Sequence, residues 1–168
     1  MKSETSTQHQ KESSTDISCG IITLSDSRKS KKADLSGQYM AEEIETRYTL
    51  KSRSLIPDEK EDLLNAIEKM VNEDIDVILT TGGTGLDSRD ITVETVEGLF
   101  EKKLDGFGEL FRAKSYEEIG AAALLSRATA GIYKKSIIFS MPGSPNAVKT
   151  ALGLIIEELP HFVHHVKK

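Results

Sequence analysis

Residues 80–92 of the chain read Thr80-Thr81-Gly82-Gly83-Thr84-Gly85-Leu86-Asp87-Ser88-Arg89-Asp90-Ile91-Thr92. The apolar run Val77-Ile78-Leu79 before this stretch predicts a buried strand. Apolar residues recur at helical spacing after it and predict a helix: Val93, Val96, Leu99 and Phe100. The glycines therefore lie in a strand-to-helix turn, where backbone N–H groups and the positive end of the helix can approach a ligand closely. This arrangement is typical of a binding site for phosphate or another anion.

This glycine turn differs from two better-known phosphate-binding turns. A nucleoside-triphosphate P-loop carries a Lys-Ser/Thr pair after its glycines, and a dinucleotide-binding turn reads G-x-G-x-x-G. Residues 80–92 follow neither pattern. The pair Arg89-Asp90 instead supplies one group that can hold an anion and one that can hold a cation or a proton. A tight connection without a ligand is the alternative interpretation of the same glycines.

Length and composition limit the class of protein. The chain has 168 residues, enough for one domain with a sizeable core. Its formal net charge of −5 argues against non-specific nucleic-acid binding, which needs a basic surface. No apolar run approaches the roughly 18 residues of a membrane span, and the N-terminus lacks the apolar centre of a signal peptide. The single cysteine, Cys19, has apolar neighbours and predicts a buried thiol, so we expect a cytoplasmic protein.

The N-terminal segment differs in composition from the rest of the chain. Residues 1–15 are rich in Ser, Thr, Gln, Lys and Glu and show no apolar periodicity. Because such a segment cannot bury enough apolar surface to order itself, we predict a disordered tail over residues 1–15. Residues 16–168 then form the single domain.

Strands and helices alternate in the first half of the predicted domain. Short β-branched or apolar runs predict strands at 17–24, 50–56 and 76–79. Helices between them are indicated by apolar residues three or four apart: Met40, Ile44 and Tyr48 in the first, and Leu63, Leu64, Ile67, Met70 and Val71 in the second.

The second half of the chain is punctuated by glycine and proline. We expect a flexible turn at 105–109, a helix entered at Leu110, a short helical run at 121–128, a hairpin turn at 131–136 and a buried strand at 137–139. Ser144 as N-cap and Pro145 as first residue begin a long final helix. Pro160 stops that helix before a short tail that contains histidines.

This order of elements predicts an α/β fold with a mostly parallel sheet. In such a sheet, ligands bind outside the carboxyl ends of the strands. Four turns therefore converge on one candidate pocket: Ser25-Asp26-Ser27, Pro57-Asp58-Glu59, residues 81–90 and residues 141–145.

Asp58 and Asp90 each have two interpretations. From the residues alone, Asp58 suits the N-cap of the following helix, with Glu61 completing a capping box. Asp90 can likewise cap the helix that begins near Thr92. Either carboxylate can instead hold Mg²⁺, which prefers carboxylates together with phosphate oxygens.

Other polar residues also keep their alternatives. Glu109 can cap its own helix, and Ser144 can cap the last helix while that helix end contacts a phosphate. Ser126-Arg127 either places a favourable cation near a helix C-terminus or lines the pocket. Three histidines share one helical face and are more typical of a surface than of a metal site: His161, His164 and His165.

Five further motifs accompany the glycine turn: Leu24-Ser25-Asp26, Ile56-Pro57-Asp58-Glu59, Gly106-Phe107-Gly108-Glu109, Leu125-Ser126-Arg127 and Met141-Pro142-Gly143-Ser144-Pro145. With residues 80–92 they resemble the MoaB/Mog family of molybdenum cofactor biosynthesis proteins, in family order and over residues 17–159. The resemblance implies a three-layer α/β/α sandwich that binds molybdopterin. It also implies transfer of adenylate from Mg-ATP to the terminal phosphate of molybdopterin, with release of pyrophosphate.

The resemblance implies that Asp58 and Asp90 are both the catalytic carboxylates and the Mg²⁺ ligands. It implies substrate contacts from Ser25, Asp26, Thr81, Gly82, Gly83, Thr84, Gly85, Arg89, Glu109, Ser126, Arg127, Pro142, Gly143, Ser144 and Pro145. A homo-trimer or hexamer is implied too, with other molybdenum cofactor biosynthesis proteins as partners. A non-catalytic molybdopterin-binding or carrier protein is the alternative, and a different nucleotide-linked phosphoryl transferase is a second one. Val93 and Asp105 stand where the family often has proline. These two differences affect the expected geometry of the loops more than the expected chemistry.

Overall fold

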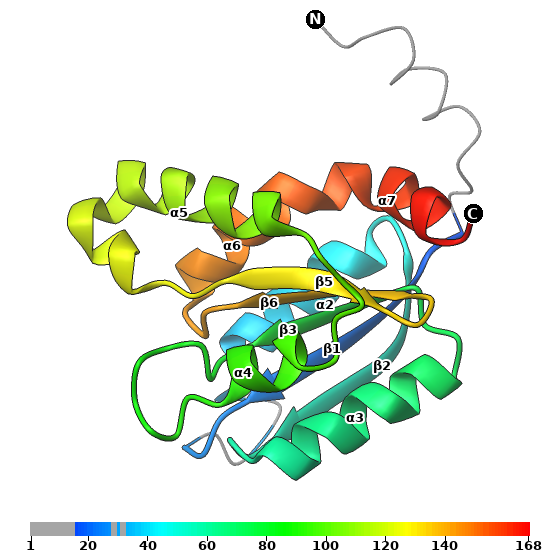
Figure 1. Ribbon diagram of the computed structural model, residues 1–168, viewed down its shortest axis with the longest axis horizontal. Helices are drawn as coiled ribbons and strands as arrows, with labels where there is room; N and C mark the ends of the chain where they lie inside the picture. Colours follow the sequence, from blue (N-terminus) through cyan, green and yellow to red (C-terminus); the bar gives the residue numbers. More distant parts are fainter. Residues whose placement is uncertain (1–15, 28–29, 31–32) are drawn as a thin grey trace, which may run out of the picture.

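The computed structural model describes residues 16–27, 30 and 33–168. They form a sheet between two layers of helices (Figure 1). The tail predicted for residues 1–15 lies outside the described residues. Among the helices of the described part, none has the length and apolar character that crossing a membrane requires.

Within the described residues, the sheet has six strands in the order β2-β1-β3-β6-β5-β4. The first four in this order run parallel: β1 (Ser18–Leu24), β2 (Thr49–Ile56), β3 (Val77–Thr81) and β6 (Ser136–Met141). The other edge is antiparallel and consists of β5 (Thr129–Tyr133) and β4 (Lys102–Lys103). The predicted α/β fold with a mostly parallel sheet is therefore confirmed.

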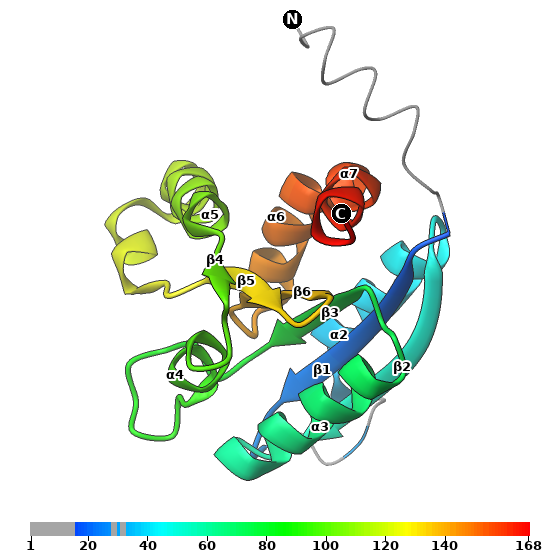
Figure 2. The same cartoon turned by 45° about the vertical axis from the view of Figure 1, so that its right-hand side comes forward.

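Helices cover both faces of this sheet (Figures 1 and 2). One face carries α2 (Leu35–Glu45), α5 (Asp105–Ile119), α6 (Pro145–Ile155) and α7 (Leu159–Val166), and the other carries α3 (Lys60–Asn72) and α4 (Thr92–Glu97). Successive strand residues face opposite layers, because side chains alternate along a strand. Ile21, Leu79 and Phe139 pack in the first layer, whereas Ile22, Ile78 and Ile138 pack in the second. The predicted α/β/α sandwich is confirmed.

The flexible turn predicted at 105–109 is wrong, because these residues form the first turn of α5. Phe107 anchors that turn with its ring 5.1 Å from the Phe139 ring, edge to face. Gly108 serves close packing rather than flexibility, since a Cβ there would lie 2.6 Å from the Ala128 carbonyl oxygen. Asp105 is the first residue of α5, a position that suits both proline and an acidic side chain.

The segment between α5 and β6 also differs from its prediction. The helical run expected at 121–128 is a 3-10 segment, η2 (Gly120–Leu125), and the chain is extended at Ser126. The predicted hairpin is present, but its turn is shorter than residues 131–136: it consists of Lys134, which has a φ of 52°, and Lys135. Residues 129–133 form β5, a strand that the sequence reasoning missed because Gly131 suggested a turn. That glycine instead lets the strand pass the Phe100 ring, which would lie 2.3 Å from an added Cβ.

Two helix ends also differ from expectation. Helix α2 ends at Glu45, before Tyr48, whose hydroxyl donates to the Ile156 carbonyl at 2.6 Å. Pro160 does not end the helical region: a short 3-10 segment, η3 (Ile156–Glu158), follows α6, and Pro160 lies in the first turn of α7. Proline fits there because the first turn of a helix has no intrahelical partner for its N–H groups. The expected histidine-bearing tail is therefore helix α7.

A buried ion pair fixes the start of α2 against the sheet. The side chain of Asp34 is fully buried and accepts hydrogen bonds from Thr23 Oγ1 at 2.7 Å and the Gly37 N–H at 2.9 Å. The guanidinium of Arg53 on β2 lies 3.2 Å from the same carboxylate. Ser36, in the first turn of α2, donates to the Gly143 carbonyl at 2.7 Å. The network thus connects β1, β2 and α2 with the turn that follows β6.

Candidate active site

The turns after the four parallel strands meet at one end of the sheet. The Gly82 N–H donates to the Met141 carbonyl at 3.1 Å, and Thr81 Oγ1 donates to the Pro142 carbonyl at 3.0 Å. The backbone N–H groups of Asp26 and Asp58 each donate to the other residue's carboxylate at 3.0 Å. The turns therefore lie together at one end of the sheet, as predicted, but of these turns, all among the described residues, only the glycine turn and the turn after β6 line the cavity described below.

The glycine turn adopts a backbone conformation that favours glycine. Gly82 and Gly83 have φ angles of 98° and 66°. A Cβ on Gly82 would lie 2.3 Å from the Leu24 carbonyl oxygen, because the turn crosses the end of β1 at very short range. Thr92 then holds the turn closed: its N–H donates to the Gly83 carbonyl at 2.9 Å and its hydroxyl to the Gly82 carbonyl at 2.8 Å.

Replacing Gly82 by alanine is therefore expected to lower the free energy of unfolding by about 1–3 kcal/mol, the usual cost of a strained left-handed backbone. Gly153→Ala is the matched control, since Gly153 is exposed within α6 and an added Cβ there would meet nothing within 4 Å. The control should gain about 0.5–1 kcal/mol from the better helix propensity of alanine. Urea denaturation measures both, and equal effects of the two variants would contradict this account of the turn.

The glycine turn presents backbone donors. Within the described residues, the N–H groups of Gly83, Thr84 and Gly85 make no hydrogen bond. These three successive donors lie at the carboxyl end of β3, where a parallel sheet binds its ligands. They can therefore serve an anion.

A cavity of about 420 Å³ lies against the turn. The turn after β6 and the N-terminus of α6 form a second wall, where Ser144 caps the helix by accepting from the Ala147 N–H at 3.2 Å. Of the predicted site residues, the cavity is lined by Gly82, Gly83, Thr84, Gly85, Asp90, Ser126, Pro142, Gly143 and Ser144. The others lie outside this lining: Ser25, Asp26, Asp58, Thr81, Arg89, Glu109, Arg127 and Pro145.

Asp58 is half-buried beneath the glycine turn. Its Oδ2 accepts from the Asp26 N–H, whereas its buried Oδ1 has no hydrogen-bond partner among the described residues. A Cβ on Gly83 would lie 3.0 Å from that Oδ1. Burial raises the pKa of Asp58, and the negative charges of Asp26 and Asp90 also raise it. The predicted helix cap is wrong: Glu59 is the N-cap of α3 and makes no side-chain cap hydrogen bond, so the capping box with Glu61 is absent.

Asp90 closes its own loop instead of capping a helix. Its Oδ2 accepts from the Asp87 N–H at 2.9 Å, and the N-cap of α4 is Ile91, without a side-chain hydrogen bond. A Cβ on Gly85 would lie 2.5 Å from Asp90 Oδ2. The two carboxylates, Asp58 and Asp90, thus contact the turn at Gly83 and Gly85.

An ion-pair network forms the rim of the site. Arg89 was expected to hold an anion, but its guanidinium contacts Asp26 Oδ2 at 2.9 Å and Glu59 Oε1 at 2.9 Å. The hydrogen bond from the Asp58 N–H lowers the pKa of Asp26, and the Arg89 guanidinium lowers it further. In the described structure Arg89 therefore holds neighbouring carboxylates together.

Glu109, Ser126 and Arg127 line a second, smaller cavity of about 330 Å³. Ser126 lines both this cavity and the one at the glycine turn. Glu109 is exposed on α5 and Leu104 is the N-cap of that helix, so the alternative of Glu109 as a cap is wrong. The motifs at 106–109 and 125–127 are therefore brought together beside the cavity at the glycine turn, which is the main cavity of the site.

The carboxylates at the turn fit what Mg²⁺ requires of a protein site. Mg²⁺ binds proteins through one or two carboxylates and completes its coordination with water and substrate phosphates. The buried Asp58 Oδ1, which has no donor among the described residues, fits that requirement. The described part of the chain contains no group of three or more His, Cys, Asp or Glu side chains that could hold a metal alone. A metal here would thus depend on the substrate phosphates.

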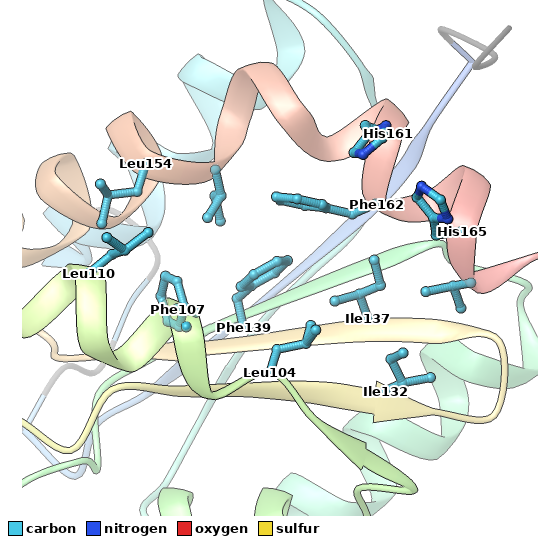
Figure 3. Close-up of a pocket in the computed structure, with 13 residues that line it drawn as sticks. Leu104, Phe107, Leu110, Ile132, Ile137, Phe139, Leu154, His161, Phe162 and His165 are labelled. Atoms are coloured by element: carbon cyan, nitrogen blue, oxygen red, sulfur yellow. The ribbon is translucent and has the colours of Figure 1, made fainter. Parts of the chain in front are cut away.

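The histidines lie elsewhere. His161 and His165 on α7 have ring centroids 4.7 Å apart and line an apolar cavity of about 400 Å³ (Figure 3). Phe107, Phe139 and Phe162 lie around the same cavity, between α5, α7 and the sheet. This cavity shares no lining residue with the cavity at the glycine turn.

Sequence reasoning missed the outer wall of the main cavity. That wall comes from α5 and from η2, through Phe111, Ser115, Glu118, Ile119, Ala122 and Leu125. Ile119 and Leu125 are 59% and 60% exposed, which is unusual for large apolar side chains at a cavity. An apolar residue at a helix end looks like a core residue in the sequence, so only the three-dimensional position identifies this wall.

Comparisons with known proteins agree with this geometry. Residues 20–161 match the model of a family described as "Probable molybdopterin binding domain". A molybdopterin adenylyltransferase of Pyrococcus furiosus is 43% identical over 166 residues, covering 96% of this chain and 98% of the relative. Molybdenum cofactor biosynthesis protein B of Bacillus anthracis is 42% identical with the same coverage. The crystal structure of the tungsten cofactor synthesizing protein MoaB from Pyrococcus furiosus superposes with a TM-score of 0.86 at 43% identity, covering 91% of this chain and 98% of that one.

Proposed function

Because the chain belongs to the family of molybdopterin-binding domains that includes the MoaB and Mog proteins, we propose that it acts in molybdenum cofactor biosynthesis and binds molybdopterin. We propose further that it is a molybdopterin adenylyltransferase, as its relative in Pyrococcus furiosus is named; the relative in Methanocaldococcus jannaschii bears the name "Probable molybdopterin adenylyltransferase". The observation that carries this proposal is the contact of two carboxylates, Asp58 and Asp90, with a turn of three unbonded N–H groups.

The reaction joins two phosphates. An oxygen of the terminal phosphate of molybdopterin attacks the α-phosphorus of ATP, a new P–O bond forms, and the bond to the β-phosphate breaks as pyrophosphate leaves. No protein nucleophile is needed, since the attacking oxygen is already anionic. Catalysis then depends on positioning and on stabilising negative charge.

The residues of the site divide this work. The N–H groups of Gly83, Thr84 and Gly85 hold one phosphate, and the N-terminus of α6 favours negative charge on the opposite wall. Asp58 and Asp90 are the residues that would hold Mg²⁺, which when bound neutralises phosphate charge. The reciprocal hydrogen bonds between Asp26 and Asp58 orient the Asp58 carboxylate.

One assay separates an enzyme from a binding or carrier protein. Purified protein is mixed with Mg-ATP, with and without molybdopterin, and pyrophosphate release is followed together with molybdopterin binding. We expect release only when both substrates and Mg²⁺ are present. Binding without release would favour the carrier. Release that needs ATP but not molybdopterin would indicate a different phosphoryl transferase.

We propose a homo-trimer or hexamer, as the resemblance implies, with other molybdenum cofactor biosynthesis proteins as partners. Large apolar side chains exposed on α5 and η2 support a subunit contact: Leu110, Tyr116, Ile119, Leu124 and Leu125. Light scattering at micromolar concentration should return three or six chain masses, and a single chain mass would reject the assembly. A cytoplasmic location suits the buried Cys19, whose thiol pKa is raised by burial to about 12.

A further inference from the structure

Arg127 holds the loop that carries Asp90. This arginine lies in the short segment between η2 and β5, at the antiparallel side of the sheet. Its Nε donates to the Thr84 carbonyl at 3.2 Å, and its Nη2 donates to the Asp90 carbonyl at 3.4 Å. Its Nη1 forms an ion pair with the carboxylate of Glu94 on α4. One guanidinium therefore contacts both ends of the loop 84–90 and the helix that follows it.

The position of the Asp90 carboxylate depends on the shape of this loop. The Asp87 N–H, in the middle of the loop, donates to Asp90 Oδ2, and the Asp90 N–H donates to the Asp87 carbonyl at 2.9 Å. The same Oδ2 packs against Gly85. If the ends of the loop separate, these contacts and the carboxylate must move together.

We propose that Arg127 is a positioning residue for Asp90, and not the substrate ligand that the sequence suggested. Its Nε, Nη1 and Nη2 each already have a partner in the protein. Its side chain is 28% exposed and is absent from the lining of the cavity at the glycine turn. The kinetic part of this inference rests on the proposed adenylyltransferase activity, whereas the loop contacts do not.

The planar fork of arginine suits this role, and lysine does not replace it. A guanidinium presents several donors in fixed directions, so that it can reach two carbonyls and a carboxylate together. A lysine keeps the charge and can satisfy Glu94 or one carbonyl, but it lacks the rigid fork that would fix the distance between the loop ends.

The test compares Arg127→Gln and Arg127→Lys with Arg112→Gln. Arg112 is the matched control because it lines the same second cavity and donates to the Ala128 carbonyl at 3.1 Å, with no contact to the loop. For Arg127→Gln we expect kcat to fall about tenfold to a hundredfold, as for a slight misplacement of a catalytic group. KM for ATP and molybdopterin should stay within about threefold, and Arg127→Lys should recover part of kcat. The control should keep kcat within about twofold.

A second measurement follows the loop itself. Amide hydrogen exchange in peptides covering residues 84–91 should become at least about tenfold faster in Arg127→Gln and stay at the parent rate in Arg112→Gln. A raised KM with unchanged kcat and unchanged exchange would assign Arg127 to substrate binding and overturn the proposal. If the parent shows no turnover, the proposed function fails, but the exchange rates still decide the role of Arg127. If Arg127→Gln does not fold, Arg127→Lys provides the same comparison.

Discussion

Replacing Asp58 by asparagine is expected to reduce Mg-dependent adenylylation of molybdopterin by about a hundredfold or more, while the protein stays folded. That magnitude is typical when one electrostatic contact to a transition state is removed. Asparagine keeps an oxygen that can accept the Asp26 N–H, but it removes the charge that Mg²⁺ requires. Asp90→Asn should lose adenylylation to a similar extent, because it also removes a charge that Mg²⁺ requires. It should stay folded, because the amide oxygen can still accept from the Asp87 N–H.

Glu59→Gln is the matched control for Asp58→Asn. Glu59 is the next residue, carries the same charge and pairs with Arg89 at the rim, whereas Asp58 Oδ1 lies against Gly83 of the glycine turn. Its replacement should change kcat less than about threefold, because exposed ion pairs contribute little. Equal losses in Asp58→Asn and Glu59→Gln would mean that the rim charge matters and that the position of Asp58 beneath the turn does not.

The raised pKa of Asp58 predicts the pH dependence of stability and of activity. A carboxyl group whose folded-state pKa exceeds its unfolded value binds its proton more tightly in the folded protein. Ionisation of Asp58 therefore disfavours folding as the pH rises above the ordinary carboxyl range, and Asp58→Asn should be at least as stable as the parent at pH 7. Because a proton on Asp58 competes with Mg²⁺, the affinity of the parent for Mg²⁺ should fall on acidification at a higher pH than an ordinary aspartate would impose. A pH–rate profile at subsaturating Mg²⁺ checks this.

The sequence predicted the part of the site that lies in continuous turns. Glycine, threonine and proline at the ends of apolar runs identify the turn after β3 and the turn after β6, because backbone shape there depends on residue type. Parallel topology then brings the turns together. The same reasoning failed at β5, where pairing with β6 overrides the tendency of Gly131 to form a turn. It also failed at Pro160, because proline is compatible with the first turn of a helix and does not end the helical region there.

The roles of charged side chains could not be predicted in the same way. Asp58 after a proline looks like a helix cap, and only its position beneath Gly83 shows that its Oδ1 has no donor among the described residues. Arg89 and Arg127 look like anion ligands, but Arg89 pairs with carboxylates of the protein, and Arg127 with two carbonyls and the Glu94 carboxylate. Long cationic side chains reach partners far away in sequence, so their contacts follow from the fold rather than from local spacing. Asp34 was not identified at all, because it lies in a polar segment without periodicity.

Asp34→Ala should nevertheless be the most destabilising replacement considered for this protein. Removing one partner of a buried ion pair typically costs about 3–5 kcal/mol, because the remaining charge keeps its desolvation penalty. Here Arg53 is only 15% exposed, and the Thr23 hydroxyl and Gly37 N–H lose the same acceptor. The loss should appear as a lower urea midpoint, with an unchanged slope if unfolding remains two-state.

Two further variants, Glu157→Ala and Arg53→Ala, distinguish loss of the Asp34–Arg53 ion pair from a general destabilisation of α2. Glu157→Ala removes one of the carboxylates that pair with Arg47, in an exposed pair with a similar N–O distance, 3.1 Å, and should cost less than about 1 kcal/mol. In a double-mutant cycle, Asp34→Ala and Arg53→Ala should cost less together than the sum of their separate effects, by about 1–3 kcal/mol. Additive effects would show that Asp34 stabilises the helix start through Thr23 and Gly37 alone. In that case the turn after β6, which Ser36 holds at Gly143, would depend on a helix cap and not on charge.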